Sequence, residues 1–146
     1  MIDKLIIGGA VAFIALLLGF ALWYFVLRRR PKKIKQDQFQ EKWLDLQKLL
    51  KDKKAWPQAI IAADKLLDEA LKKKRFSGKG MGERLVKAQR LLTDNDGVWF
   101  GHKLRNKIEQ DDKMKLKEKD VKQALVGIRQ ALKDLGALPN GQKRDS

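Results

Sequence analysis

Residues 5–27 read LIIGGAVAFIALLLGFALWYFVL and contain no charged side chain. As an α-helix, a stretch of this length extends about 34 Å at 1.5 Å per residue. The hydrocarbon core of a bilayer is about 30 Å thick, so the stretch predicts one transmembrane helix near the N-terminus. Trp23 and Tyr24 lie near its C-terminal end, where amphipathic aromatic rings prefer the membrane interface.

A cleaved signal peptide is the alternative interpretation of this stretch. The apolar core of a signal peptide is usually about 7–15 residues long and leads to a cleavage site of small residues. Here the apolar stretch is longer, and a basic flank follows it. That flank consists of Arg28, Arg29, Arg30, Pro31, Lys32 and Lys33. The flank is typical of a stop-transfer signal, so the sequence favours an uncleaved anchor.

The same flank predicts the orientation of the anchor. Six of the eight residues from Arg28 to Lys35 are basic, and none is acidic. The positive-inside rule places such a flank in the cytoplasm and the N-terminus outside. We therefore expect an integral protein of the plasma or inner membrane. The flank could also attract anionic headgroups, at about 1 kcal/mol per basic residue, and a pure topology signal is the alternative.

The remainder of the chain predicts a bundle of about five helices. Apolar residues recur at helical spacing, and no window alternates strictly enough to be a strand. The first stripe consists of Phe39, Trp43, Leu46 and Leu50, and the last of Val121, Leu125, Ile128, Leu132 and Leu135. Gly136 follows as a helix C-cap residue. The predicted fold is therefore all-α, with a single transmembrane helix followed by a cytoplasmic helical bundle.

Four segments follow from this pattern. Residues 1–30 form the transmembrane anchor with its basic flank, and residues 31–38 form a juxtamembrane linker. Residues 39–136 form the helical bundle, within which we expect helices at about 81–92 and 98–110. Residues 137–146 form a disordered tail.

Composition excludes several kinds of chemistry. The chain has no cysteine, and His102 is its only histidine, so thiolate catalysis, disulfides and His-rich metal sites are excluded. We therefore expect neither a metal nor a small-molecule cofactor. The glycine-rich loop around Gly78, Gly80 and Gly82 lacks Walker A spacing, and we interpret it as a flexible loop. The formal net charge of +15 favours anionic partners: acidic lipid, nucleic acid or an acidic protein.

The helix expected at 98–110 carries most of the candidate site residues: Trp99, Arg105 and Asn106 for binding, and Arg105 and His102 for catalysis. Trp99, His102, Arg105 and Asn106 follow one another at steps of three, three and one, so they project towards one side. Arg105 lies at the edge of the buried stripe and needs a partner, since an unpaired buried charge is costly. Two carboxylates four residues apart on the second bundle helix are the candidates for that partner. They are Asp64 and Asp68.

The segment His102-Lys103-Leu104-Arg105-Asn106-Lys107-Ile108 resembles the signature helix of HEPN-type domains. These are small helical bundles with an Arg-Asn-x-x-x-His motif on a late helix. Residues 62–71 and 80–85 also resemble earlier helices of that family, so the resemblance covers Phe39 to Leu135.

Many HEPN-type domains are metal-independent ribonucleases that dimerise around a shared cleft, and others bind RNA or protein. Arg105 and Asn106 match the motif, whereas Gln110 occupies the position of its histidine. Glutamine does not titrate near neutral pH and cannot act as a general acid or base. The resemblance therefore favours a non-catalytic member.

Three functions follow. The first is a membrane-tethered, non-catalytic binding module that forms a homodimer through the helix at 98–110 and binds RNA or an acidic protein. The second is a membrane-anchored ribonuclease, with Arg105 and His102 as the candidate catalytic residues. The third is a structural scaffold that grips anionic lipid of the bilayer.

Overall fold

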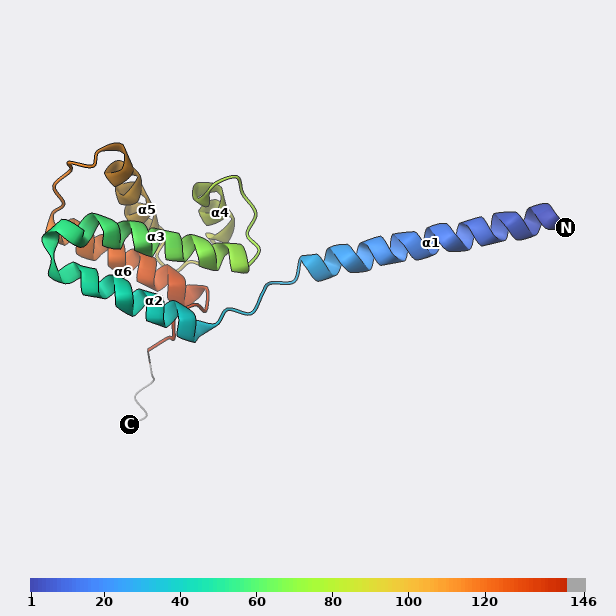
Figure 1. Ribbon diagram of the computed structural model, residues 1–146, viewed down its shortest axis with the longest axis horizontal. Coiled ribbons are helices and arrows are strands. Elements are labelled where there is room, and N and C mark those ends of the chain that lie inside the picture. Colours follow the sequence, from blue (N-terminus) through green and yellow to red (C-terminus); the bar gives the residue numbers. More distant parts are fainter. Residues whose placement is uncertain (142–146) are drawn as a thin grey trace. The chain divides into compact units, whose positions relative to one another are not determined.

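The computed structural model describes residues 1–141 and divides the chain into two compact units, residues 1–31 and 32–146 (Figure 1). The described part of the chain is helical and contains no strand. Its α-helices are α1 (Ile2–Arg28), α2 (Gln36–Lys48), α3 (Trp56–Lys73), α4 (Met81–Ala88), α5 (Asn95–Gln110) and α6 (Glu118–Asp134). Two short 3-10 turns, η1 (Leu49–Lys51) and η2 (Lys53–Ala55), connect α2 to α3. The predicted fold class, one apolar N-terminal helix followed by a helical bundle, is confirmed.

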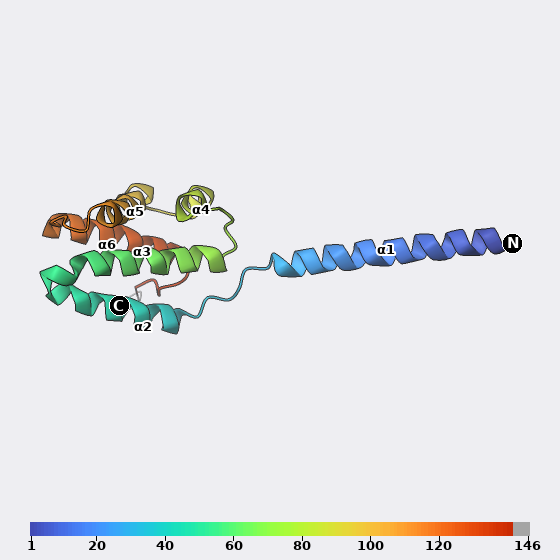
Figure 2. The same cartoon turned by 45° about the horizontal axis from the view of Figure 1, so that its top comes forward.

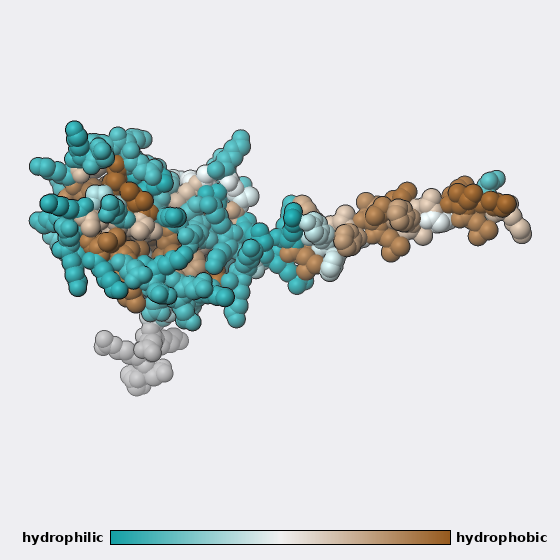
Figure 3. Space-filling view, viewed as in Figure 1, coloured by the Kyte–Doolittle hydropathy of each residue, from teal (hydrophilic) through white to brown (hydrophobic). Residues whose placement is uncertain are grey.

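The first unit consists mainly of α1. It is long and apolar enough to cross a membrane, and none of its residues is buried within the protein. Figure 3 shows the apolar residues along it. At its C-terminal end, the Arg28 guanidinium lies 4.8 Å from the ring centre of Tyr24, and Arg29 lies 3.9 Å from that of Phe25. Aromatic rings and cations thus gather at one end of the helix, as is typical of a membrane interface.

The second unit is built around α3. This helix contacts α2, α4, α5 and α6, and Figure 2 shows it between α2 and the α5–α6 pair. Its inward residues Ile60, Ala63, Leu67 and Leu71 are fully buried. Burial of this kind contributes about 1.5–3 kcal/mol for each large apolar side chain. The core lies entirely within the second unit.

Close approach between α5 and α6 depends on two glycines. A Cβ atom on Gly101 would lie 2.9 Å from the side chain of Ile128. A Cβ atom on Gly127 would collide with the backbone of Gly97. The two helices therefore pack almost backbone to backbone, which orients the α5 face that carries the candidate site.

The bundle is longer at both ends than the sequence predicts. The Lys32 N–H donates to the carbonyl of Lys73 at 3.0 Å, and Ile34 packs against the core. Most of the segment 31–38 is therefore not a free linker, because α2 begins at Gln36 and residues 32–35 are part of the second unit.

At the other end of the bundle, Ala137 and Leu138 are buried, so the expected tail does not begin at residue 137. Residues 142–146 of that tail lie outside the described residues. The helical periodicity of the sequence did not predict either extension of the bundle, because the apolar residues of these extensions lie outside the helices.

Two other boundaries differ from expectation. α4 ends at Ala88 rather than near Leu92. α5 begins at Asn95 rather than Val98, because the Asp94 carboxylate accepts a hydrogen bond from the Gly97 N–H at 2.9 Å. This contact is an N-cap, which supplies an acceptor to an otherwise unpaired N–H of the first helical turn.

α3 and α6 end in the same left-handed turn. After α6, Gly136 has φ +74° and the Ala137 N–H donates to the carbonyl of Leu132. After α3, Arg75 has φ +66° and the Phe76 N–H donates to the carbonyl of Leu71. Glycine adopts this conformation readily, whereas any other L-residue loses about 1–2 kcal/mol. The expected role of Gly136 is confirmed, and Arg75 occupies the corresponding position under strain.

Candidate functional site

Asp64 lies at the centre of the candidate site. It projects from α3 towards α5 and is 2% exposed. His102 Nδ1 lies 3.1 Å and 3.2 Å from its two carboxylate oxygens, and Arg105 Nε lies 3.6 Å from Oδ2. Of the two carboxylates expected to pair with Arg105, Asp64 is the partner. A buried carboxylate is stable only when such groups surround it.

His102 is held on two sides. On one side, Nδ1 of its ring contacts the Asp64 carboxylate. The ring of Trp99 lies edge-on to the imidazole, with ring centres 5.9 Å apart. His102 keeps only 8% of its surface exposed. These contacts give His102 a packing and orienting role between α3 and α5.

Arg105 is surrounded by oxygen atoms from its own helix as well. Its Nη2 lies 2.9 Å from Glu109 Oε1, and its Nη1 donates to Asn106 Oδ1 at 3.0 Å. Asp64 and Glu109 therefore place two carboxylates beside one guanidinium. Their negative charge offsets that of the arginine and opposes the approach of a phosphate. The arrangement is an internal ion-pair cluster.

Asp68, the other expected partner of Arg105, pairs instead with Arg84 of α4. Arg84 Nε and Nη2 donate to its two oxygens at 2.7 Å and 3.0 Å, and Lys72 Nζ lies 3.0 Å from Oδ2. Burial raises the pKa of Asp68, but the hydrogen bonds from Arg84 and Lys72 outweigh it, so the pKa lies below its ordinary value of 3.8. Sequence reasoning missed Arg84, although its place between Met81 and Leu85 on an apolar stripe was a signal.

The glycine-rich loop is tied to α4. Arg84 Nη1 donates to the carbonyl of Gly78 at 2.8 Å, and the N–H of Lys79 donates to Glu83 Oε2 at 3.0 Å. Lys87 Nζ donates to Ser77 Oγ at 2.7 Å. The loop that we expected to be flexible therefore has three side-chain contacts that hold it, and the Lys79 N–H is already paired.

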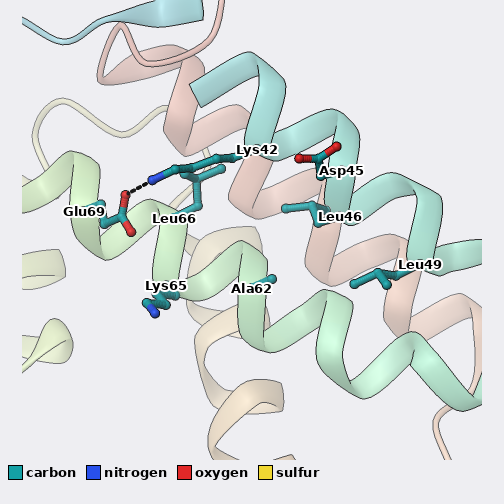
Figure 4. Close-up of a pocket in the computed structure, with 8 residues that line it drawn as sticks. All are labelled: Lys42, Asp45, Leu46, Leu49, Ala62, Lys65, Leu66 and Glu69. Atoms are coloured by element: carbon teal, nitrogen blue, oxygen red, sulfur yellow. Dashed lines mark hydrogen bonds and ion pairs between the residues drawn. The ribbon is translucent and has the colours of Figure 1, made fainter. Parts of the chain in front are cut away.

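A shallow groove of about 460 Å³ lies between α2 and α3 (Figure 4). Leu46, Leu49 and Leu66 line it. An ion pair of 2.9 Å between Lys42 Nζ and Glu69 Oε2 crosses it. None of the predicted site residues borders this groove.

The structure brings together five of the six site residues that the sequence predicts within the bundle, four of them candidate binding residues and the fifth, His102, a candidate catalytic residue. These are Asp64, Trp99, His102, Arg105 and Asn106. Asp68 belongs to the separate contact with α4. Within residues 1–141, no three His, Asp or Glu side chains lie close enough together to hold a metal ion.

Comparisons with models of protein families, with curated proteins and with solved structures found no match to this chain. The resemblance to HEPN-type domains therefore rests on short sequence segments alone, chiefly the one on α5.

Proposed function

We propose that this protein is a membrane-tethered, non-catalytic binding module, with its bundle on the cytoplasmic face and an anionic partner. The apolar helix α1 and the basic residues after it support the tether and its orientation. Residues 32–141 contain 27 Lys and Arg and 16 Asp and Glu, which leaves a net charge of +11 on the folded unit. A surface of this charge attracts anionic partners over distances of about 10 Å at moderate salt.

The observation that carries the non-catalytic proposal is the pairing of Arg105. In a ribonuclease of the HEPN type this arginine would stabilise charge on a phosphate. Here Arg105 contacts Asp64 and Glu109, and Gln110 occupies the histidine position of the motif. Two carboxylates beside Arg105 and a glutamine at the position of the proton carrier support a module that does not cleave RNA.

Incubation of the full-length protein with mixed-sequence RNA, without added metal, tests the non-catalytic proposal. We expect no cleavage by the wild type. We also expect none by Gln110→His, which restores the motif but leaves Arg105 paired. Cleavage that disappears in Arg105→Ala, with the helical circular dichroism unchanged, would overturn the proposal and establish the ribonuclease.

Protease accessibility in sealed cells and in inverted membrane vesicles tests the topology. We expect a protease added outside intact cells to leave the bundle uncut and the same protease to digest it in inverted vesicles. Release of the protein from membranes by alkaline carbonate would contradict the tether. Digestion of the bundle in intact cells would contradict the orientation alone.

A further inference from the structure

One end of the bundle gathers positive charge from two segments that are distant in the sequence. We call this surface the basic end. It consists of Lys32, Lys33, Lys35, Lys72, Lys73, Lys74 and Arg75. Only Ile34 among the eight residues of segments 32–35 and 72–75 is not basic, and none is acidic. The hydrogen bond from the Lys32 N–H to the Lys73 carbonyl, 3.0 Å long, joins the segments.

The backbone under the basic end is anchored to the core. Ile34 packs against the core, and Lys73 Nζ lies 5.3 Å from the ring centre of Phe39. Lys33, Lys35 and Lys74 are exposed, and the structure shows no ion pair between them and another residue within 1–141. Several cations therefore point into solvent from a fixed frame, which preorganises them for a multivalent anionic surface.

Arg75 supplies an independent observation. It occupies the left-handed position that ends α3, where α6 uses Gly136. Strained backbone conformations of this kind cluster at functional sites. Glycine at this position would relieve the strain and remove the charge, so the exchange of Arg75 for glycine tests whether the charge is used.

The covalent chain restricts where the basic end can act. Lys32 follows Arg28, the last residue of α1, by four residues, a reach of at most about 14 Å for extended chain. If α1 spans the membrane as proposed above, Lys32 lies close to the cytoplasmic headgroups. The cytoplasmic leaflet is negatively charged and attracts basic segments next to a transmembrane helix.

We propose that the basic end docks the bundle onto anionic lipid headgroups of the cytoplasmic leaflet. This proposal rests on the membrane tether of the proposed function and names the anionic partner. Proximity favours lipid over RNA, because the tether holds the surface beside the headgroups continuously. Docking gives the bundle one preferred face towards the bilayer and leaves α5 and the groove between α2 and α3 available to other contacts.

Binding of residues 32–146 to vesicles tests the surface without α1, since this unit contains the whole core. The probes are phosphatidylcholine vesicles with and without phosphatidylserine. We expect binding only to the anionic vesicles, weakened by salt. The triple variant Lys33→Gln, Lys35→Gln, Lys74→Gln should bind about 100-fold more weakly.

The matched control removes the same charge at the opposite end of the α2–α3 hairpin and at the start of α6. It carries Lys51→Gln, Lys54→Gln and Lys119→Gln, three exposed lysines. We expect it to retain affinity within a few-fold of the wild type. Equal losses in the two triple variants, or no binding to anionic vesicles, would overturn the proposal. Stronger binding to mixed-sequence RNA than to the vesicles would also overturn it and leave the tethered module intact.

The variant Arg75→Gly distinguishes a role of Arg75 in lipid binding from a role in the stability of the bundle. We expect this variant to melt at a higher temperature than the wild type and to bind anionic vesicles about fivefold more weakly. A merely structural arginine would predict no change in binding, and that result would remove Arg75 from the basic end.

Full-length protein in nanodiscs completes the test. The chain has no cysteine, so a single dye can be placed at Ser77→Cys near the basic end or at Gln58→Cys at the other end of α3. Energy transfer to headgroup-labelled lipid should rise at position 77, more than at 58, when phosphatidylserine is included. Unchanged transfer would overturn docking, whereas failure of the protein to enter nanodiscs would contradict the tether itself.

Discussion

Asp64 shows how one buried charge determines its neighbours. The carboxylate is almost completely enclosed, and its close partners are His102 and Arg105 of α5. In an isolated helix, Arg105 and His102 would be ordinary surface residues. Packing against α3 makes them the groups that neutralise and hydrogen-bond a carboxylate which water cannot reach.

Replacement of His102 by alanine should therefore destabilise the bundle. The variant leaves Asp64 with Arg105 alone, so we expect the free energy of unfolding to fall by about 2–3 kcal/mol. Urea denaturation of residues 32–146 measures it. Glu69→Ala is the control, because its ion pair with Lys42 is exposed and contributes about 0–1 kcal/mol. Equal losses in the two variants would contradict the importance of the buried contact.

Asp68 predicts a specific acid sensitivity. Burial raises the pKa of Asp68 in the folded protein, but the hydrogen bonds from Arg84 and Lys72 lower it by more, so this pKa lies below 3.8. The unfolded chain then binds more protons at low pH, so the contribution of Asp68 is present above its unfolded pKa and is lost as pH falls through the folded pKa. As the pH falls from about 5 to about 3, we expect the free energy of unfolding of Asp68→Asn to decrease less than that of the wild type. Parallel pH curves for the two proteins would contradict this assignment.

At the scale of the elements, contacts between helices depend on glycines, which have a low intrinsic helix propensity. Glycine inside a helix is unfavourable by about 0.5–1 kcal/mol relative to alanine. Gly127 nevertheless lies within α6, because its lack of a side chain lets the backbone of α5 approach at Gly97. The sequence shows only the unfavourable propensity, whereas the compensating contact exists only once α5 and α6 pack.

Two helical glycines should consequently respond in opposite ways to alanine. Gly127→Ala forces α5 and α6 apart, and we expect a loss of about 1–3 kcal/mol. Gly82→Ala places its methyl group 3.8 Å from Trp99, an ordinary contact, so we expect unchanged or slightly higher stability. Thermal melts of both variants test this prediction, and a stable Gly127→Ala protein would show that the helices can separate without loss.

For the whole molecule, the limits of the folded unit decide which fragments are stable. A fragment that begins at residue 39 loses the hydrogen bond between Lys32 and Lys73, the packing of Ile34 and the bond from Gln36 Nε2 to the Gly136 carbonyl. We expect it to be less stable than residues 32–146 by about 1–3 kcal/mol. Removal of residues 1–31 alone should leave the stability of the bundle unchanged, because no residue of α1 is buried.

Comparison of the two fragments by urea denaturation, with the same C-terminus, measures this difference. Identical stabilities would mean that residues 32–38 behave as the free linker expected from the sequence.

Local features of the chain were sufficient to predict the long apolar helix near the N-terminus and the helical class of the rest of the chain. The uncharged stretch 5–27 and the stripe from Phe39 to Leu50 depend only on length and on a repeat of 3.6 residues, and both are visible within about 20 residues. The sequence limited the candidate partners of Arg105 to two carboxylates on one helix, but it did not show which of the two pairs with it. Both candidates lie on α3, and only the placement of α4 and α5 around it assigns Asp64 to Arg105 and Asp68 to Arg84.

Only the tertiary structure joins the two segments of the basic end. These two segments are 40 residues apart: 32–35 belongs to the basic flank that the sequence displays, and 72–75 consists of three lysines and an arginine at the end of α3. The turn at Arg75 and the hydrogen bond between Lys32 and Lys73 join them into one surface. The periodicity of apolar residues is a local property, so a sequence displays it directly. The neighbours of a charged side chain depend instead on how distant elements pack. Networks of ion pairs and charged surfaces that combine distant segments therefore appear only in the folded chain.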